Sequence, residues 1–276
     1  MLIRQKAVIC LLLAALLWST GGVLIKLVDW HPMALAGARS LIAAAIIRLA
    51  FRNQPLACSK EQWIGAAAYC SCTSLFVIST KLTTAANAIL LQYTAPIFVA
   101  FFAGWLLKEK ATRRDWLTIV FVLAGMAFFF FDKVTTGGML GNITSVLAGI
   151  SFALFIVCMR MQKGASPYGS VLLGNILTFL ISLPFWSDIS LSVTNLLGIT
   201  LLGIFQLGLA YVLYTRAISH VPALKATLIT SIEPILNPIW VVLLVGERPG
   251  FYSLIGGTIV LSALFTRYWA DYKEQS

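Results

Sequence analysis

Charged side chains are scarce in this chain of 276 residues. Asp, Glu, Lys and Arg make up only 11% of it, whereas 59% is hydrophobic, and the mean hydropathy is +0.90. Soluble domains contain about 25% charged residues. The composition therefore excludes a soluble globular protein and predicts an all-α polytopic membrane protein. Its net charge of +10 reflects Lys and Arg in membrane loops, so we expect no nucleic-acid partner.

Several motifs of catalysis and metal binding are also missing. The chain contains no GxxxxGK[ST], HExxH or GxSxG segment and no pair of aspartates within an apolar run. ATP-driven transport within this chain and hydrolysis are therefore unsupported, and an intramembrane enzyme stays a remote alternative. The closely spaced Cys70 and Cys72 lack a second His or Cys cluster, which favours buried thiols over a metal site. We expect no cofactor.

Apolar runs separated by charged or Gly/Pro-rich breaks predict ten transmembrane helices. Their expected ranges are 7–27, 32–51, 62–80, 86–107, 115–131, 140–161, 168–186, 193–215, 225–245 and 252–268.

The charges between these spans predict the orientation of the chain. With ten spans, 15 of the 20 Lys and Arg residues lie on the side of the N-terminus and 4 on the other side. Cytoplasmic loops carry the excess of positive charge. We therefore expect both termini in the cytoplasm and the chain in the cytoplasmic membrane.

The sequence also repeats itself. A shift of 138 residues brings identical residues together: Ala85 with Ala223, Pro96 with Pro234, and Glu109 with Glu247. A shift of 134 places Trp18 on Phe152 and Lys26 on Arg160. We predict two five-helix repeats, residues 1–135 and 136–276. Five is an odd number, so the second repeat is expected to be inverted in the membrane. Such symmetry within one chain is compatible with a monomer or a homodimer.

Four segments carry a resemblance to a known family. They are AALLWSTGGVLIK, NAILLQYTAPIFVAFFAGWLLKEK, KATLITSIEPILNPIWVVLLVGER and SLIGGTIVLSALF. In order and spacing they resemble the EamA-type branch of the drug/metabolite transporter superfamily, over essentially the whole chain. The resemblance implies a ten-span secondary carrier that moves amino acids, other metabolites or toxic compounds, often outward. The first repeat has Ala95 before Pro96 where the second has Glu233 before Pro234.

Glu233 is the one acidic residue of ten that is predicted to lie deep in the membrane. A charged group at that depth costs several kcal/mol and normally faces a cavity or a partner. In a medium of low dielectric a lone carboxylate favours its protonated form, so Glu233 could exchange a proton with water on either side. It could equally balance an amine of the cargo, or be a neutral packing residue on a helix that Pro234 and Pro238 loosen.

Arg39 is the one cation predicted to lie well inside a span. It could bind a carboxylate of the cargo, snorkel toward the membrane surface or tether helices. The other candidate binding residues are polar or aromatic side chains in equivalent spans, which should point into the bundle or serve as interhelical contacts: Trp18, Gln92, Tyr93, Tyr211 and Asn237.

These residues together favour a secondary active transporter for small metabolites such as amino acids, coupled to protons and directed outward. Import of a small metabolite, or efflux of cationic drugs, is the alternative. A channel would favour rings of equivalent polar residues, whereas here Glu233 is opposite Ala95. The expected partners are a small-molecule substrate, protons and the lipid bilayer.

Overall fold

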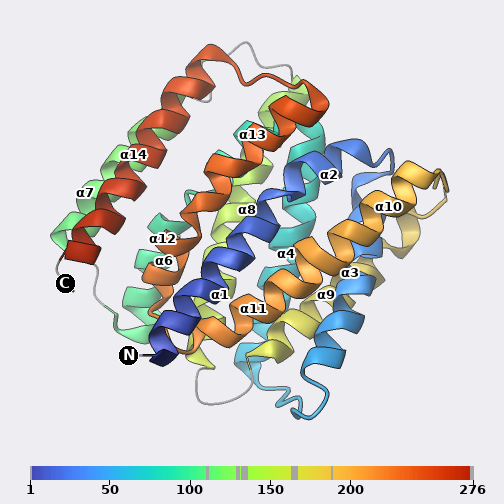
Figure 1. The fold of residues 1–276 in the computed structure, drawn as a ribbon, viewed down its shortest axis with the longest axis horizontal. Helices are drawn as coiled ribbons and strands as arrows, with labels where there is room; N and C mark the ends of the chain where they lie inside the picture. The colour runs from blue at the N-terminus through green and yellow to red at the C-terminus, as the bar shows by residue number, and fades with distance from the viewer. Residues whose placement is uncertain are drawn as a thin grey trace.

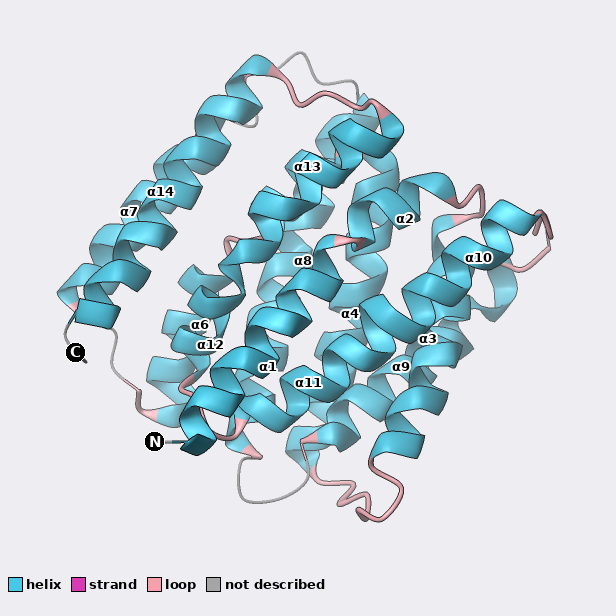
Figure 2. Ribbon diagram, viewed as in Figure 1, coloured by secondary structure: helices cyan, strands magenta, loops and turns pink. Residues whose placement is uncertain are grey.

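The computed structural model describes residues 2–109, 112–128, 131, 136–162, 167–187 and 189–273. All regular elements in these ranges are helices joined by short loops (Figure 2). The first half contains α1 (Leu2–Ser19), α2 (Gly21–Leu27), α3 (Pro32–Ala50), α4 (Lys60–Leu82), α5 (Ala85–Gln92), α6 (Ala95–Phe102), the π-helix η1 (Ala103–Leu107) and α7 (Arg113–Phe128). The second half contains α8 (Thr136–Met161), α9 (Tyr168–Ser182), η2 (Leu183–Phe185), α10 (Val193–Leu201), the π-helix η3 (Leu202–Leu209), α11 (Ala210–Ile218), α12 (Ala223–Ile229), the 3₁₀-helix η4 (Thr230–Ile232), α13 (Glu233–Val245) and α14 (Phe251–Lys273).

Eight described helical segments are long and apolar enough to cross a membrane. They coincide with eight of the ten predicted spans, which confirms an all-helical polytopic protein. The other two predicted spans correspond to α7 and α14, whose described apolar stretches are shorter. The count of ten and the inverted repeats therefore stay predictions. The predicted boundary after residue 135 adjoins residues 132–135, which lie outside the described residues.

Two of the spans are interrupted in front of a proline. The chain leaves helical geometry at Tyr93 and Thr94 before Pro96, and it tightens into η4 before Pro234. A proline has no N–H to donate to the carbonyl four residues earlier. The carbonyl of Thr230, four residues before Pro234, is thus left without its helical donor. A third span divides at Thr20, between α1 and α2, which the sequence did not predict.

The helices form a bundle in which segments far apart in the chain are neighbours (Figure 1). At its centre α4 packs against α8 and α9, and α3 packs against α9 and η3. The start of α1 and the end of α14 point toward the same end of the bundle, where both termini lie (Figure 1).

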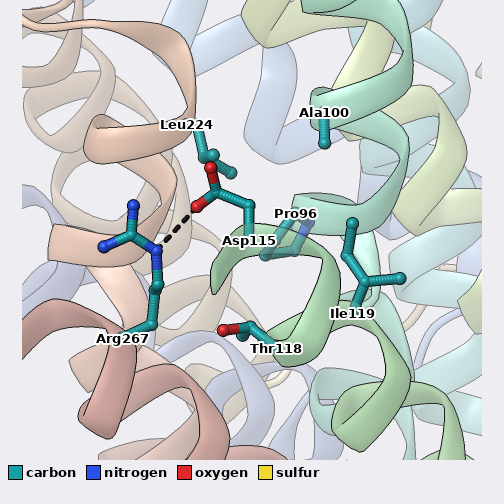
Figure 3. A pocket seen from close by; sticks show the side chains of 7 residues that line it. All are labelled: Pro96, Ala100, Asp115, Thr118, Ile119, Leu224 and Arg267. Carbon is teal, nitrogen blue, oxygen red and sulfur yellow. Dashed lines mark hydrogen bonds and ion pairs between the residues drawn. The ribbon is translucent and has the colours of Figure 1, made fainter. Parts of the chain in front are cut away.

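Helices α7 and α14 lie side by side at one edge of the bundle (Figure 1). A buried ion pair joins them, with 2.6 Å between Nε of Arg267 and Oδ1 of Asp115 (Figure 3). The other carboxylate oxygen of Asp115 accepts hydrogen bonds from the backbone N–H and the hydroxyl of Thr112. The charges of this pair are thus compensated locally, and we regard the contact as structural.

Candidate functional site

Five of the seven predicted site residues line one cavity of about 30 Å³ at the centre of the bundle. They are Trp18 of α1, Arg39 of α3, Gln92 of α5, Tyr211 of α11 and Glu233 of α13. The remaining wall consists of Cys72, Thr73, Phe76, Phe152, Gln206 and Leu207. Both halves of the chain therefore contribute to the site.

Arg39 is a buried cation held by neutral groups. Its side chain is 1% exposed. The two terminal nitrogens donate hydrogen bonds to Oε1 of Gln206 and to the carbonyl of Thr73, both at 3.1 Å. Within the described residues no partner is found for its Nε, and no ion pair joins it to Glu233. The guanidinium thus forms no ion pair in the cavity wall.

Gln206 reaches Arg39 from the π-helix η3. A π-helix accommodates extra residues per turn, so its side chains point in directions that a regular α-helix would not give them, and such segments are frequent at functional sites. The sequence indicated that Gln206 is a polar residue within a span. It gave no signal for the π-helical geometry that brings Gln206 to Arg39.

Glu233 also lines the cavity and contacts Tyr93. Glu233 is 7% exposed and Tyr93 is 2% exposed. The phenolic oxygen of Tyr93 is 2.9 Å from Oε2 of Glu233 and 2.7 Å from the carbonyl oxygen of Thr230. Tyr93 comes from the interrupted span of the first half, and it contacts the interrupted span of the second half at the carbonyl of Thr230, which also accepts a 3₁₀-type hydrogen bond from the backbone N–H of Glu233.

The two contacts of Tyr93 constrain the proton of Glu233. A phenol has a single proton to donate, and a backbone carbonyl can only accept. Each contact has a proton of its own when Tyr93 donates to Thr230 and a protonated Glu233 donates to the Tyr93 oxygen, whereas with an ionised Glu233 the single phenolic proton is shared between two acceptors. The arrangement therefore fits a neutral Glu233, and the cavity then holds the positive charge of Arg39 alone.

Aromatic rings close one side of the cavity. The ring of Trp18 lies 4.9 Å from that of Tyr211 and 6.0 Å from that of Phe152, measured between centroids. Tyr211 also stands edge-on to Tyr69 at 4.8 Å. Offset and edge-to-face contacts of this kind are favourable. The wall offers an apolar surface, or a cation–π surface for a positively charged group.

The structure places Asn237 away from this cavity. Its side chain is fully buried against Gly22 of α2, where a β-carbon would lie 2.1 Å from Oδ1 of Asn237. Within the described residues neither polar atom of its amide has a hydrogen-bond partner. Cys72 is a buried free thiol as expected, and it also contributes to the cavity wall and accepts a hydrogen bond from Gln92.

The cavity is small for a cargo. Its volume of about 30 Å³ matches the space of a single water molecule, whereas binding pockets for small molecules usually have about 300–1,000 Å³. The structure therefore corresponds to a closed arrangement, and a metabolite can enter only after helices move apart. Within the described residues there is also no cluster of His, Cys, Asp or Glu side chains that could bind a metal.

Several known proteins resemble this chain over nearly its whole length. An uncharacterized transporter of Archaeoglobus fulgidus is 23% identical, with 95% of this chain and 97% of the relative aligned. The uncharacterized transporter YwfM of Bacillus subtilis is 27% identical over 96% of this chain and 94% of its own. A crystal structure described only as that of a protein has the same fold, with a TM-score of 0.74, 18% identity and coverage of 99% and 100%.

These likenesses, together with the apolar helices, define a multi-pass membrane transporter. The sequence model of the EamA-like transporter family matches residues 5–131 and again residues 139–268. The chain therefore belongs to the EamA-like transporter family, which confirms the resemblance to the drug/metabolite transporter superfamily.

Proposed function

We propose that this transporter exports small polar metabolites such as amino acids across the cytoplasmic membrane and uses protons as its coupling ion. The observation that carries the proposal is the single central cavity lined by both Arg39 and Glu233. Ionisable side chains within a membrane are costly and usually mark a substrate or proton pathway. These two are contributed by different halves of the chain, as expected for a site between inverted repeats.

Arg39 is proposed to bind a carboxylate of the cargo. A buried cation without a counter-charge is unfavourable in a medium of low dielectric. With Glu233 protonated, a carboxylate would supply that counter-charge, and Nε of Arg39 has a donor without a partner in the described residues. A guanidinium forms two parallel hydrogen bonds with a carboxylate, which also fixes the orientation of the cargo.

Glu233 is proposed to carry the coupling proton. In the closed arrangement its proton is held by the oxygen of Tyr93, and opening toward water would allow it to leave. The ionised carboxylate could then attract an ammonium group. A cargo with both charges, such as an amino acid, would therefore match the two sides of the cavity.

The proposal includes an orientation. Both termini lie at one end of the bundle (Figure 1), and the excess of Lys and Arg in the loops at that end supports a cytoplasmic location. The double match to one family model supports two repeats of the same unit. One chain contains a complete cavity, which suits a monomer and is compatible with a homodimer.

The experiment is a comparison of metabolites inside and outside cells by mass spectrometry. Cells that produce the wild type, Glu233→Gln or no transporter are loaded with amino acids and related metabolites. We expect one compound class to build up outside with the wild type only. Accumulation inside would favour import, and loss of cationic drugs without any effect on metabolites would favour drug efflux. No redistribution of any compound by the wild type contradicts the proposal.

A further inference from the structure

Two ion pairs at opposite ends of the bundle are built in the same way. At one end Nζ of Lys26 lies 2.7 Å from Oε2 of Glu247 and donates a hydrogen bond of 2.9 Å to the carbonyl of Thr83. We call these three residues the Lys26 latch. They come from α2, from the residue after the end of α4, and from the loop after α13.

At the other end, Nε of Arg160 lies 3.5 Å from Oε1 of Glu109. Its terminal nitrogen donates a hydrogen bond of 2.8 Å to the carbonyl of Ser219. We call these residues the Arg160 latch. They come from α8, from the residue after the end of α11, and from the loop after η1.

The members of the two latches occupy equivalent places in the two sequence repeats. Arg160 is 134 residues after Lys26, and Glu247 is 138 residues after Glu109. Each acid directly follows a left-handed residue that ends its helix, Lys108 in one half and Gly246 in the other. In the second half, left-handed geometry is satisfied by glycine, as is common at helix ends.

The carbonyl acceptors are equivalent as well. Thr83 caps α4, the third span of the first half, and Ser219 caps α11, the third span of the second half. The agreement of a cation, an acid and a capping carbonyl in both halves is difficult to attribute to chance contacts between loops. Inverted repeats would place one copy of such a motif on each face of the membrane.

Each latch joins the two halves of the chain. The Lys26 latch connects α2 to the end of α13, and Glu247 also accepts a hydrogen bond of 2.6 Å from the backbone N–H of Ala85. The Arg160 latch connects α8 to the end of the span that contains α6 and η1. The broken spans that carry Tyr93 and Glu233 are thus fastened at both ends, with the closed cavity between them.

We propose that Lys26 with Glu247, and Arg160 with Glu109, are the residues that close the two entrances of the cavity, and that transport opens them in turn. By the orientation of the charges, the Lys26 latch faces the exterior and the Arg160 latch faces the cytoplasm. The inference rests on the proposed transport function for its biological meaning. Its test measures access to the cavity and needs neither cargo nor transport.

The two latches differ in strength in this closed structure. The Lys26–Glu247 contact is short and has an additional backbone bond at Ala85, whereas the Arg160–Glu109 distance of 3.5 Å is long for a charged hydrogen bond. The Glu109 side chain is also 35% exposed, compared with 22% for Glu247. We infer that the cytoplasmic entrance opens more readily than the external one.

Cys72 provides a native reporter for this test, because its thiol lines the cavity. The other free cysteines (Cys10, Cys58, Cys70 and Cys158) are replaced by Ser or Ala in the full chain. A charged, membrane-impermeant methanethiosulfonate is much larger than the closed cavity, so it reaches Cys72 only through an open entrance. It is added to right-side-out or inside-out membrane vesicles, and the rate of labelling is measured by mass spectrometry.

Lys26→Gln and Glu247→Gln are expected to raise labelling of Cys72 from the exterior about tenfold, which corresponds to about 1.4 kcal/mol. Labelling from the cytoplasmic side should stay unchanged or fall. Arg160→Gln and Glu109→Gln should raise labelling from the cytoplasmic side instead. The exchanged pair Lys26→Glu with Glu247→Lys should restore slow labelling.

Matched controls exist at both ends. Lys81 donates to the carbonyl of Val28 within the first half, and Arg48, in the last turn of α3, donates to the carbonyl of Arg52 in the loop that follows. Lys81→Gln and Arg48→Gln remove a charge without separating the two halves and should leave labelling unchanged. Equal labelling from both sides in the latch variants, or no change at all, overturns the inference even if transport itself is demonstrated.

Discussion

Removal of one oxygen atom from Tyr93 tests the hydrogen-bond arrangement around Glu233. Tyr93→Phe keeps the ring and its packing, so no large cavity results. It deletes the donor to the carbonyl of Thr230 and the partner of the Glu233 carboxyl group. The Thr230 carbonyl then keeps the 3₁₀-type hydrogen bond from the backbone N–H of Glu233 and gains no α-helical donor, because residue 234 is a proline.

The magnitude follows from the burial of these groups. A buried polar atom that loses its only partner costs about 1–3 kcal/mol. Glu233 is 7% exposed, and its carboxyl group has Tyr93 as the one hydrogen-bond partner found within the described residues, so we expect Tyr93→Phe to lower the free energy of unfolding by an amount in this range. The loss of the acceptor for the Glu233 proton should in addition make the closed arrangement less favourable.

Tyr214→Phe is a matched control. Tyr214 is fully buried like Tyr93, but its hydroxyl has no hydrogen-bond partner within the described residues. Removal of an unsatisfied hydroxyl is expected to be neutral or slightly stabilising.

The assay measures thermal unfolding of both purified variants in detergent, followed by transport in proteoliposomes. Tyr93→Phe should unfold at a clearly lower temperature than the wild type and lose transport against a gradient. Tyr214→Phe should resemble the wild type in both measurements. The same small effect for both substitutions would refute the hydrogen-bond argument.

Three further predictions concern other parts of the structure. Arg39→Ala should weaken transport of a carboxylate-bearing cargo about 10- to 100-fold, which is the scale of a charged hydrogen bond. It should affect a neutral analogue less. Equal losses for both compounds in a competition assay would indicate a structural role. Gly22→Ala should lower the free energy of unfolding by about 1–3 kcal/mol, because the β-carbon of the new alanine would overlap Asn237. An unchanged melting temperature would contradict the close packing. Asp115→Asn should destabilise the protein by about 3–5 kcal/mol because it removes the carboxylate of the buried ion pair with Arg267. An apolar replacement of both residues should recover most of the loss in the same unfolding assay.

Much of the site could be predicted from the sequence because ionisable residues are so rare in the membrane. The sequence singled out Glu233 and Arg39 because both are predicted to lie deep in the membrane. The structure brings them to one cavity together with Trp18, Gln92 and Tyr211. Pro234 and Pro238 predicted a loosened helix, and the chain tightens into η4 directly before Glu233. The interruption at Tyr93, before Pro96, was not predicted. Whether these residues bind cargo and protons stays a prediction.

Other features depend on contacts between helices that a sequence pattern does not contain. The π-helix that presents Gln206 has no residue signature in the chain, and its approach to Arg39 depends on packing against α3. Asn237 was expected at the binding site because it is polar and close to Pro238. The structure instead buries it against Gly22, about 6 Å farther along the helix axis than Glu233, which lies four residues earlier.

The ion pairs at the ends of the bundle are a further feature that the sequence did not predict. The alignment of the repeats placed Lys26 with Arg160 and Glu109 with Glu247, but it did not indicate that a cation of one half meets an acid of the other. The partners of Glu109 and Glu247 became evident only from the relative position of the two halves.

The central claim is that Glu233 couples proton movement to transport of a small metabolite. The most direct measurement uses proteoliposomes that contain the wild type or Glu233→Gln, a mixture of isotopically labelled amino acids and an imposed pH gradient, with mass spectrometry as the readout. We expect the wild type to concentrate at least one amino acid against its gradient. Glu233→Gln should exchange that amino acid across the membrane but fail to concentrate it. Concentration driven by the pH gradient in Glu233→Gln would contradict the account.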